Sequence, residues 1–240
     1  MPVVSGLTVR RVGHKGADHI APGNTTASFD AALAHAVDMI EFDVLPEHED
    51  EPERGRLILS HDHAHVVPGS LTLQEGLAHL ASSQFAHVEL DVDIKLPGYE
   101  RRVVEALREH GLIERTLVSS LFMRSLIALR ELEPRLRLGW SVPRVKRDYT
   151  ASPLTLVPAY GLLWNARRRL PGIAAEHVRA GRCDALMAHW KLVTPRLVQA
   201  LRDAGGDLYV WTVDDRARIL ALEALGVTGV ITNDPRLFDA

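Results

Sequence analysis

The chain has little cysteine, few aromatic residues and no long apolar run. Cys183 is the single cysteine among 240 residues, so an internal disulfide is excluded, and no Cys-x-x-Cys or Cys/His zinc spacing occurs. Aromatic residues make up 5% of the chain. No apolar stretch approaches the length of about 18 residues that a membrane-spanning helix needs. Disulfide scaffolds, zinc ribbons and membrane-spanning proteins are therefore excluded.

The charge of the chain is nearly balanced. Lys and Arg number 28 against 31 Asp and Glu, a net charge of −3, so there is no basic excess to indicate nucleic-acid binding. The first residues lack the apolar segment of a secretory signal peptide. We therefore expect a cytoplasmic protein that binds no nucleic acid and has no transmembrane segment. The sequence does not indicate an oligomeric state.

Short β-branched apolar runs alternate with amphipathic stretches along the whole chain, which is the pattern of a repeated β/α unit. Such runs are typical of strands that are buried on both faces of a parallel sheet. The predicted strands are Val9–Val12, Met39–Val44, Leu57–Ser60, Val88–Ile94, Thr116–Ser119, Leu136–Val142, Ala185–Ala188, Leu208–Val213 and Val227–Thr232. The pattern and the length predict a single α/β domain over residues 1–240, a (β/α)₈ TIM barrel.

One predicted strand is more than a (β/α)₈ barrel needs. The acidic loop between Met39–Val44 and Leu57–Ser60 is too short to hold a crossover helix, so we expect these two strands to form a hairpin at the barrel mouth. Asn24 is predicted to cap a helix that runs through Leu33, and Thr72 forms a predicted capping box with Glu75.

Polar residues concentrate at the C-terminal ends of the predicted strands, where such barrels keep their active sites. Because side chains alternate along a strand, Glu41 and Asp43 point to one side, and Asp93 and Lys95 also share a side. Carboxylates buried together must bind a cation, become protonated or form salt bridges. Oxygen ligands without thiolates favour Mg²⁺ or Ca²⁺. Salt bridges to Arg10, Arg11 or Lys95 are the alternative.

Two histidines end predicted strands beside these carboxylates. Either His14 or His61 alone is explained by a buried histidine with satisfied hydrogen bonds. Together, at two neighbouring strand ends, they indicate an acid–base pair.

The order of the motifs resembles that of the glycerophosphodiester phosphodiesterase family, and the resemblance extends from His14 to Pro235. The motifs are His14-Lys15-Gly16, Pro22-Gly23-Asn24-Thr25, Glu41-Phe42-Asp43, His61-Asp62, Asp93-Ile94-Lys95, Trp211-Thr212-Val213 and Thr232-Asn233-Asp234-Pro235. The resemblance implies a (β/α)₈ barrel that hydrolyses glycerophosphodiesters to an alcohol and glycerol 3-phosphate. It also implies two catalytic histidines and one divalent cation, Mg²⁺ or Ca²⁺.

The family pattern gives each matching residue an expected role. His14 and His61 would be the catalytic pair. The expected metal ligands are Glu41, Asp43 and Asp93. The expected substrate-binding residues are Lys15, Lys95 and Trp211.

Three features depart from the family pattern. Gly23 stands where the family has glutamate, so the function of that carboxylate must be absent or supplied from elsewhere. Asp93 is one methylene shorter than the usual glutamate. The interval from Asp62 to Asp93 is short, so we expect a barrel without a large inserted subdomain and with a more open pocket.

Two other functions fit parts of the sequence. The alternation of His61, His63 and His65, with His189 at a later strand end, is compatible with a metal hydrolase barrel of the amidohydrolase type. A barrel that binds a phosphorylated ligand without cleaving it is the non-enzymatic alternative.

The stretch Leu154–Trp164 allows transient lipid contact, because aromatic residues and three following arginines suit an amphiphilic surface. A helix packed on the barrel explains the same residues, and we favour this interpretation.

Overall fold

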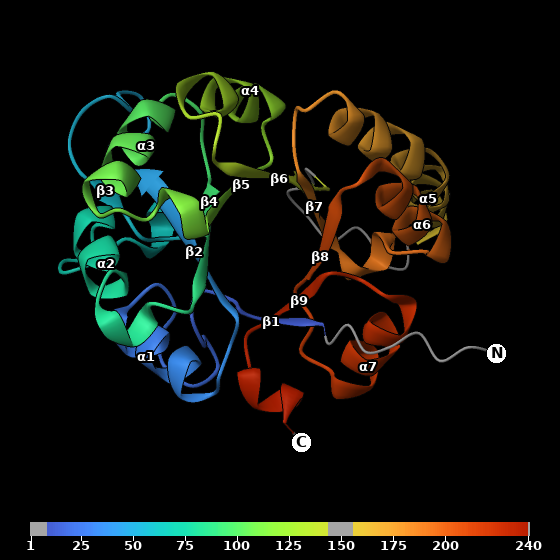
Figure 1. Cartoon of the computed structure of the whole chain (residues 1–240), viewed down its shortest axis with the longest axis horizontal. Helices are drawn as coiled ribbons and strands as arrows, with labels where there is room; N and C mark the ends of the chain where they lie inside the picture. The colour runs from blue at the N-terminus through green and yellow to red at the C-terminus, as the bar shows by residue number, and fades with distance from the viewer. Residues whose placement is uncertain (1–8, 144–155, 240) are drawn as a thin grey trace.

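Eight parallel strands close into a barrel in the computed structural model, which describes residues 9–143 and 156–239. The strand β1 pairs with both β2 and β9, and this double pairing closes the sheet. Figure 1 shows the helices on the outside of the strands. The barrel strands are β1 (Arg10–Gly13), β2 (Met39–Pro46), β4 (Glu89–Ile94), β5 (Thr116–Ser120), β6 (Arg137–Val142), β7 (Ala185–His189), β8 (Asp207–Trp211) and β9 (Gly229–Thr232).

The ninth strand is the predicted hairpin partner. The short strand β3 (Leu57–Ile58) pairs antiparallel with the end of β2, with Ile58 opposite Leu45 and Leu57 opposite Pro46. It stands outside the closed barrel, as the short acidic loop requires. The (β/α)₈ prediction and the choice of the extra strand are both confirmed.

The helices follow the amphipathic stretches of the sequence. They are α1 (Thr26–Ala34), α2 (Leu73–Leu80), α3 (Glu100–Glu109), α4 (Met123–Leu132), α5 (Leu156–Arg179), α6 (Pro195–Ala204) and α7 (Arg216–Leu225). The capping box of Thr72 and Glu75 is confirmed. The cap predicted at Asn24 is wrong, because Thr25 caps α1 and Asn24 adopts a left-handed backbone with a φ of 60°.

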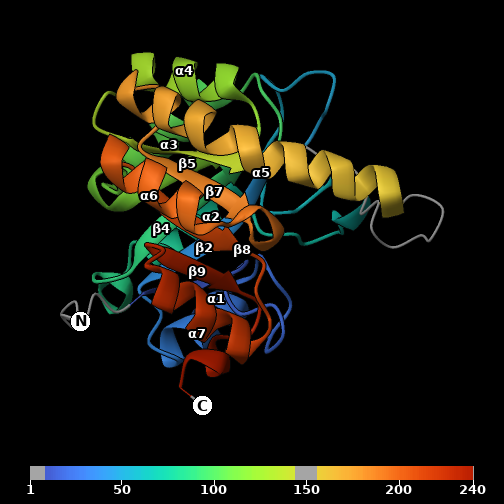
Figure 2. The same cartoon turned by 90° about the vertical axis from the view of Figure 1, so that its right-hand side faces the viewer.

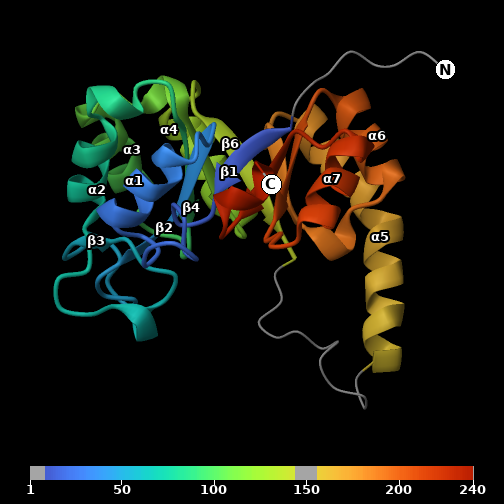
Figure 3. The ribbon, with the colours of Figure 1, turned by 90° about the horizontal axis from the view of Figure 1, so that it is seen from below.

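The helix α5 covers most of the stretch for which lipid contact or a packed helix was expected; residues 154–155 lie outside the described part. Its later turns pack on the barrel, where Leu170 and Ala174 are buried. Its first turns extend beyond the other helices in Figures 2 and 3. Within the described residues, no helix combines the length and apolarity needed to cross a membrane.

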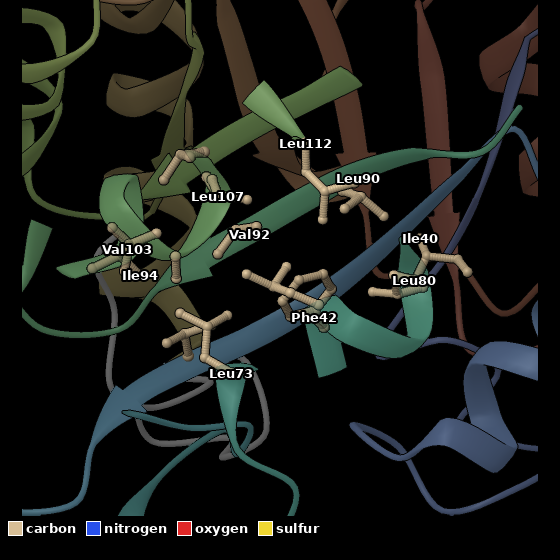
Figure 4. Close-up of a cluster of buried hydrophobic side chains, with 14 of the residues drawn as sticks. Ile40, Phe42, Leu73, Leu80, Leu90, Val92, Ile94, Val103, Leu107 and Leu112 are labelled. Carbon is tan, nitrogen blue, oxygen red and sulfur yellow. The ribbon is translucent and has the colours of Figure 1, made fainter. Parts of the chain in front are cut away.

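Two apolar layers hold the barrel together. The outer layer lies between strands and helices; Figure 4 shows part of it, where side chains of β2 and β4 meet those of α2 and α3. Burial of this kind contributes about 25 cal/mol for each Å² of apolar surface removed from water. The inner layer lies inside the barrel, and it consists of Val12, Met39, Leu117, Ala185, Met187, Tyr209 and Ile231. Side chains of this kind fill the interior of such barrels as a packed core.

An ionic network lies at the N-terminal ends of the strands. Glu89 accepts hydrogen bonds from Arg10 and from Arg137, which also donates to Asp207 at 2.9 Å. The Arg137 guanidinium lies 3.3 Å from the hydroxyl of Tyr209 in the inner layer. Two arginines and two carboxylates thus balance their charges at this end, which we call the floor.

The inner layer predicts the effect of adding one methyl group at Gly229. A Cβ atom there would lie 2.6 Å from Cδ1 and 2.7 Å from Cε1 of Tyr209. Because overpacking a close-packed interior costs about 1–3 kcal/mol, Gly229→Ala should lower the free energy of unfolding by that amount in urea titrations. The control Gly172→Ala adds its Cβ where no atom lies within 4 Å, so it should not destabilise. Equal stability of the two variants would contradict the prediction.

The end of α4 predicts a pH-dependent contribution to stability. Hydrogen bonds from Arg135 and Arg108 lower the pKa of Glu133 from 4.5 to about 2, against the opposing effect of burial. A folded-state pKa below the unfolded one stabilises the protein above the unfolded pKa, and the gain is lost as the pH falls through the folded pKa. Thermal unfolding should therefore show Glu133→Gln less stable than wild type near neutral pH, with the gap narrowing toward about pH 2. Glu131→Gln, at an exposed position of α4, should show no such trend.

Candidate active site

A cavity of about 320 Å³ opens at the C-terminal ends of the strands. Most of the residues predicted for the site line it: His14, Glu41, His61, Asp93, Lys95 and Trp211. Asp43 lies directly behind this surface and is fully buried. Lys15 is not among the residues that line the cavity, and its amine lies 3.2 Å from Asp18.

The register of two neighbouring strands brings the acidic residues together. Asp43 of β2 stands opposite Asp93 of β4. Glu41 precedes Asp43 by two positions and faces the same side. One oxygen each of Glu41, Asp43 and Asp93 lies within 4.8 Å of the others. The predicted carboxylate cluster is thus present in the folded chain.

A buried tyrosine fixes the ends of these two strands. The Tyr99 hydroxyl donates to the carbonyl oxygen of Val44 at 2.6 Å and accepts from the backbone N–H of Lys95 at 3.1 Å. Lys95 therefore leaves β4 at a defined place, with its ammonium 2.5 Å from Asp93 and in contact with Asp43. Of the three cations considered as salt-bridge partners for Glu41 and Asp43, Lys95 pairs with Asp43. Arg10 instead pairs with Glu89, and Arg11 with Asp239.

One lysine does not neutralise the acids that surround it. Burial and the neighbouring Asp43 raise the pKa of Glu41 well above its ordinary value. Burial acts in the same direction on Asp43, but Lys95 and the two histidines hold the pKa of Asp43 well below its usual range. Burial lowers the pKa of Lys95, yet Asp43 and Asp93 outweigh it, so this pKa is raised. The neighbouring carboxyl groups are thus driven toward different protonation states.

The acidic cluster fits a divalent cation. Asp93 has a buried Oδ1 that receives no hydrogen bond in the described structure. The three carboxylates offer only hard oxygen donors, which suit Mg²⁺ or Ca²⁺. Binding of a cation there would also release the proton that the raised pKa of Glu41 retains.

A further carboxyl group lies deeper in the cavity. Asp91 precedes Asp93 by two positions and points to the same side of β4. Burial, with a contribution from Asp93, raises the pKa of Asp91 to about 8. The side chains of Ser119 and Lys95 oppose this shift. Asp91 is therefore mostly protonated at neutral pH. The alternation of side chains along β4 places Asp91 on the cavity side, but the sequence pattern alone assigned Asp91 no role.

The imidazole of His14 is oriented by residues from the other end of the chain. Its Nδ1 lies 2.5 Å from Oδ1 of Asn233, whose amide nitrogen donates to Asp214 at 2.7 Å. Because that bond turns the amide oxygen toward His14, Nδ1 carries the proton and Nε2 has the free lone pair. Nε2 faces Glu41 at 3.9 Å. Burial lowers the pKa of His14, which favours the neutral ring.

His61 approaches the same cluster from the β3 side. Its Nδ1 lies 3.6 Å from Oδ2 of Asp43, and its side chain is 57% exposed, against 19% for His14. The two histidines therefore flank the carboxylates, one inside the barrel mouth and one at its edge. Both imidazoles thus lie at the cavity where the sequence predicts an acid–base pair.

Three residues of the site were not predicted from the sequence. Asn24 donates to Oδ2 of Asp43 and accepts from its backbone N–H, at 2.9 and 3.0 Å. Asn233 and Asp214 orient His14 as described. All three lie in or beside the motifs that carry the family resemblance, which was the available signal.

Comparison with known proteins agrees with this geometry. Residues 71–237, more than half of the chain, match the Glycerophosphoryl diester phosphodiesterase family. The chain belongs to this family. It is accordingly a phosphoric diester hydrolase of the glycerophosphodiester phosphodiesterase type, and the non-enzymatic alternative is set aside.

Individual relatives match nearly the whole chain, including strands that precede residue 71. The chain is 24% identical to the glycerophosphodiester phosphodiesterase of Caldanaerobacter subterraneus subsp. tengcongensis, over 93% of each chain. The chain also resembles the crystal structure of a glycerophosphodiester phosphodiesterase from Agrobacterium tumefaciens, with a TM-score of 0.68 and 19% sequence identity. The match covers 96% of this chain and 99% of that one. An Oleispira antarctica phosphodiesterase, solved in complex with the product sn-glycerol-3-phosphate, matches with a TM-score of 0.71 and 19% sequence identity. This match covers 96% of this chain and 97% of that one. These structures confirm the barrel fold.

The amidohydrolase alternative is wrong, because the chain belongs to the phosphodiesterase family. Among the described residues, the histidines considered for that alternative do not form a group that could hold a metal ion. His63 and His65 belong to a short 3₁₀ turn, η1 (His63–His65), rather than to a strand. His63 contacts the carbonyl oxygen of Pro46 at 2.8 Å, and His65 contacts Asp62 at 2.6 Å. His189 packs its ring on Trp190 and Trp211. In the described part of the chain, the one group of side chains placed so that it could hold a metal ion consists of carboxylates alone.

Proposed function

We propose that this phosphodiesterase hydrolyses glycerophosphodiesters to an alcohol and glycerol 3-phosphate by two-histidine acid–base catalysis. The observation that carries the proposal is that His14 and His61, from the segments that follow two different strands, approach one carboxylate cluster within 3.9 Å and 3.6 Å. The product found with the Oleispira antarctica relative supports glycerol 3-phosphate as the product here.

The ligand set of the proposal is Glu41, Asp43 and Asp93. A divalent cation held there, Mg²⁺ or Ca²⁺, supplies positive charge that offsets the negative oxygens of the phosphodiester. The hydrogen bonds of Asn24 keep Asp43 in place for this role. Lys95 contacts two of the three carboxylates, so it offsets part of their charge, and it lines the cavity wall that the phosphate would face.

His14 is the base or nucleophile of the proposal, because its neutral ring presents Nε2 to the cavity while Asn233 holds Nδ1. His61 is the general acid. It protonates the leaving alkoxide, which departs poorly as an anion, and its exposed side faces the opening through which the alcohol leaves.

The other predicted substrate contacts lie at the sides of the cavity. Trp211 lines the wall, and its ring nitrogen donates to the carbonyl oxygen of Met187 at 2.9 Å, which fixes the ring face. Lys15 is proposed to contact the phosphate from the edge of the mouth.

Removing either histidine should lower turnover sharply. General acid–base catalysis contributes about 10²–10⁴-fold, so His14→Ala and His61→Ala should each lower kcat by at least about 10²-fold. Steady-state hydrolysis of glycerophosphodiesters measures this, with product analysis for glycerol 3-phosphate. His87→Ala, an exposed histidine ahead of β4, is the control and should keep the wild-type rate. Near-native turnover in either of the first two variants would refute the assignment.

Chelation should abolish activity, and added Mg²⁺, Mn²⁺ or Ca²⁺ should restore it. The reason is that three carboxylates in one cluster, two of them buried, bind a divalent cation far better than single carboxylates elsewhere on the surface. Titration calorimetry should also show weaker cation binding in Asp93→Asn than in wild type. If excess chelator leaves turnover unchanged, the cation has no part in the reaction.

A further inference from the structure

The loop between β1 and α1 holds the backbone of Lys15 firmly. The backbone N–H of Lys15 donates to Oε2 of Glu41 at 2.9 Å. Its carbonyl oxygen accepts from the backbone N–H of Asn24 at 3.0 Å and from the hydroxyl of Ser28 at 2.7 Å. A positive φ of 50° turns the chain at this point. With the backbone fixed against a proposed metal ligand and the start of α1, the place of the ammonium depends on the partner of the side chain.

That partner is Asp18. Its Oδ2 lies 3.2 Å from Nζ of Lys15, and its Oδ1 accepts a hydrogen bond from the backbone N–H of Gly23 at 2.8 Å. The side chains of Lys15 and Asp18 are 21% and 31% exposed, so solvent competes only in part. The carboxylate is thus anchored by one oxygen to the loop and holds Lys15 with the other.

Gly23 leaves the space that Asp18 fills. A Cβ atom at this position would lie 2.6 Å from Oδ1 of Asp18 and 2.8 Å from Cβ of Lys15. Both distances are shorter than atoms tolerate without moving, so a side chain at residue 23 and the Asp18 carboxylate exclude each other in this conformation. This chain lacks glutamate at residue 23, and an oxygen of the Asp18 carboxylate lies 2.6 Å from the point where the Cβ of a side chain there would be.

Lys15 stands beside the catalytic cavity. It directly follows His14, which lines that cavity, and its backbone N–H donates to Glu41, which lines it too. A long side chain anchored at this place can bring its ammonium to a phosphate bound in the cavity.

We propose that Asp18 is a positioning residue that holds the ammonium of Lys15 at the edge of the mouth for the substrate phosphate, and that Gly23 is glycine because Asp18 occupies the adjacent space. The inference rests on the proposed role of Lys15 in binding substrate. In place of a carboxylate carried by residue 23 itself, the chain uses one carried five residues earlier.

A double-mutant cycle tests the proposal. Asp18→Asn keeps the size of the side chain and removes its charge, and it should raise KM by about threefold to tenfold while kcat changes by less than about twofold. Lys15→Met should raise KM at least as much. In the Lys15→Met background, Asp18→Asn should add no further effect, because Asp18 acts through Lys15.

The outcomes separate this inference from the proposed function. An equal effect of Asp18→Asn in both backgrounds, an effect on kcat instead of KM, or no effect at all would overturn it. Calorimetric affinity for glycerol 3-phosphate, measured in the same four proteins, should weaken in the same pattern and does not depend on turnover. Failure of the proposed function would instead appear as an absence of hydrolysis in the wild type.

Two further variants check the geometry. Gly23→Ala retains Asp18 but places a Cβ on its Oδ1, so it should raise KM in the same direction; an unchanged KM would overturn the spatial part of the proposal. Glu51→Gln removes another ion pair of the same sequence spacing, that of Glu51 with Arg54 at 3.1 Å. This pair lies in the acidic loop, so KM should stay at the wild-type value.

Discussion

Four carboxyl groups share the mouth of this barrel with one lysine, and the arrangement of the site follows from that imbalance. Like charges in a poorly solvated interior repel strongly, so they separate into different protonation states or recruit positive charge. Glu41 and Asp91 respond by retaining protons, while Asp43 stays ionised beside Lys95. A site in this condition is prepared for a dication, since its binding replaces protons that the isolated chain must hold.

The same imbalance accounts for the neutral polar groups around the acids. Asn24 satisfies Asp43 without adding charge, and Asn233 orients His14 in the same way. Asp214 keeps the Asn233 amide from rotating. Because these contacts join the first loop to the last one, closure of the barrel by β1 and β9 is itself a condition for the geometry of His14.

The sequence predicted the parts of the site that depend on strands. Alternation along a strand fixes the side on which Glu41, Asp43 and Asp93 point, and the barrel brings strand ends together, so the cluster followed from local pattern. The loops were different. Asn24 looked like a helix cap, but its backbone is left-handed and its amide binds a residue 19 positions away. The direction of the Lys15 side chain depends on Asp18 and on the space at Gly23, which no periodicity encodes.

The floor network has a consequence for how the interior as a whole behaves. Its two arginines and two carboxylates cancel one another, and the apolar layer above separates them from the mouth. The floor arginines are therefore occupied by their own carboxylates and do not neutralise the excess negative charge of the acids at the mouth. Because the cavity opens at the C-terminal ends of the strands, any positive charge that neutralises these acids must approach from that side of the barrel.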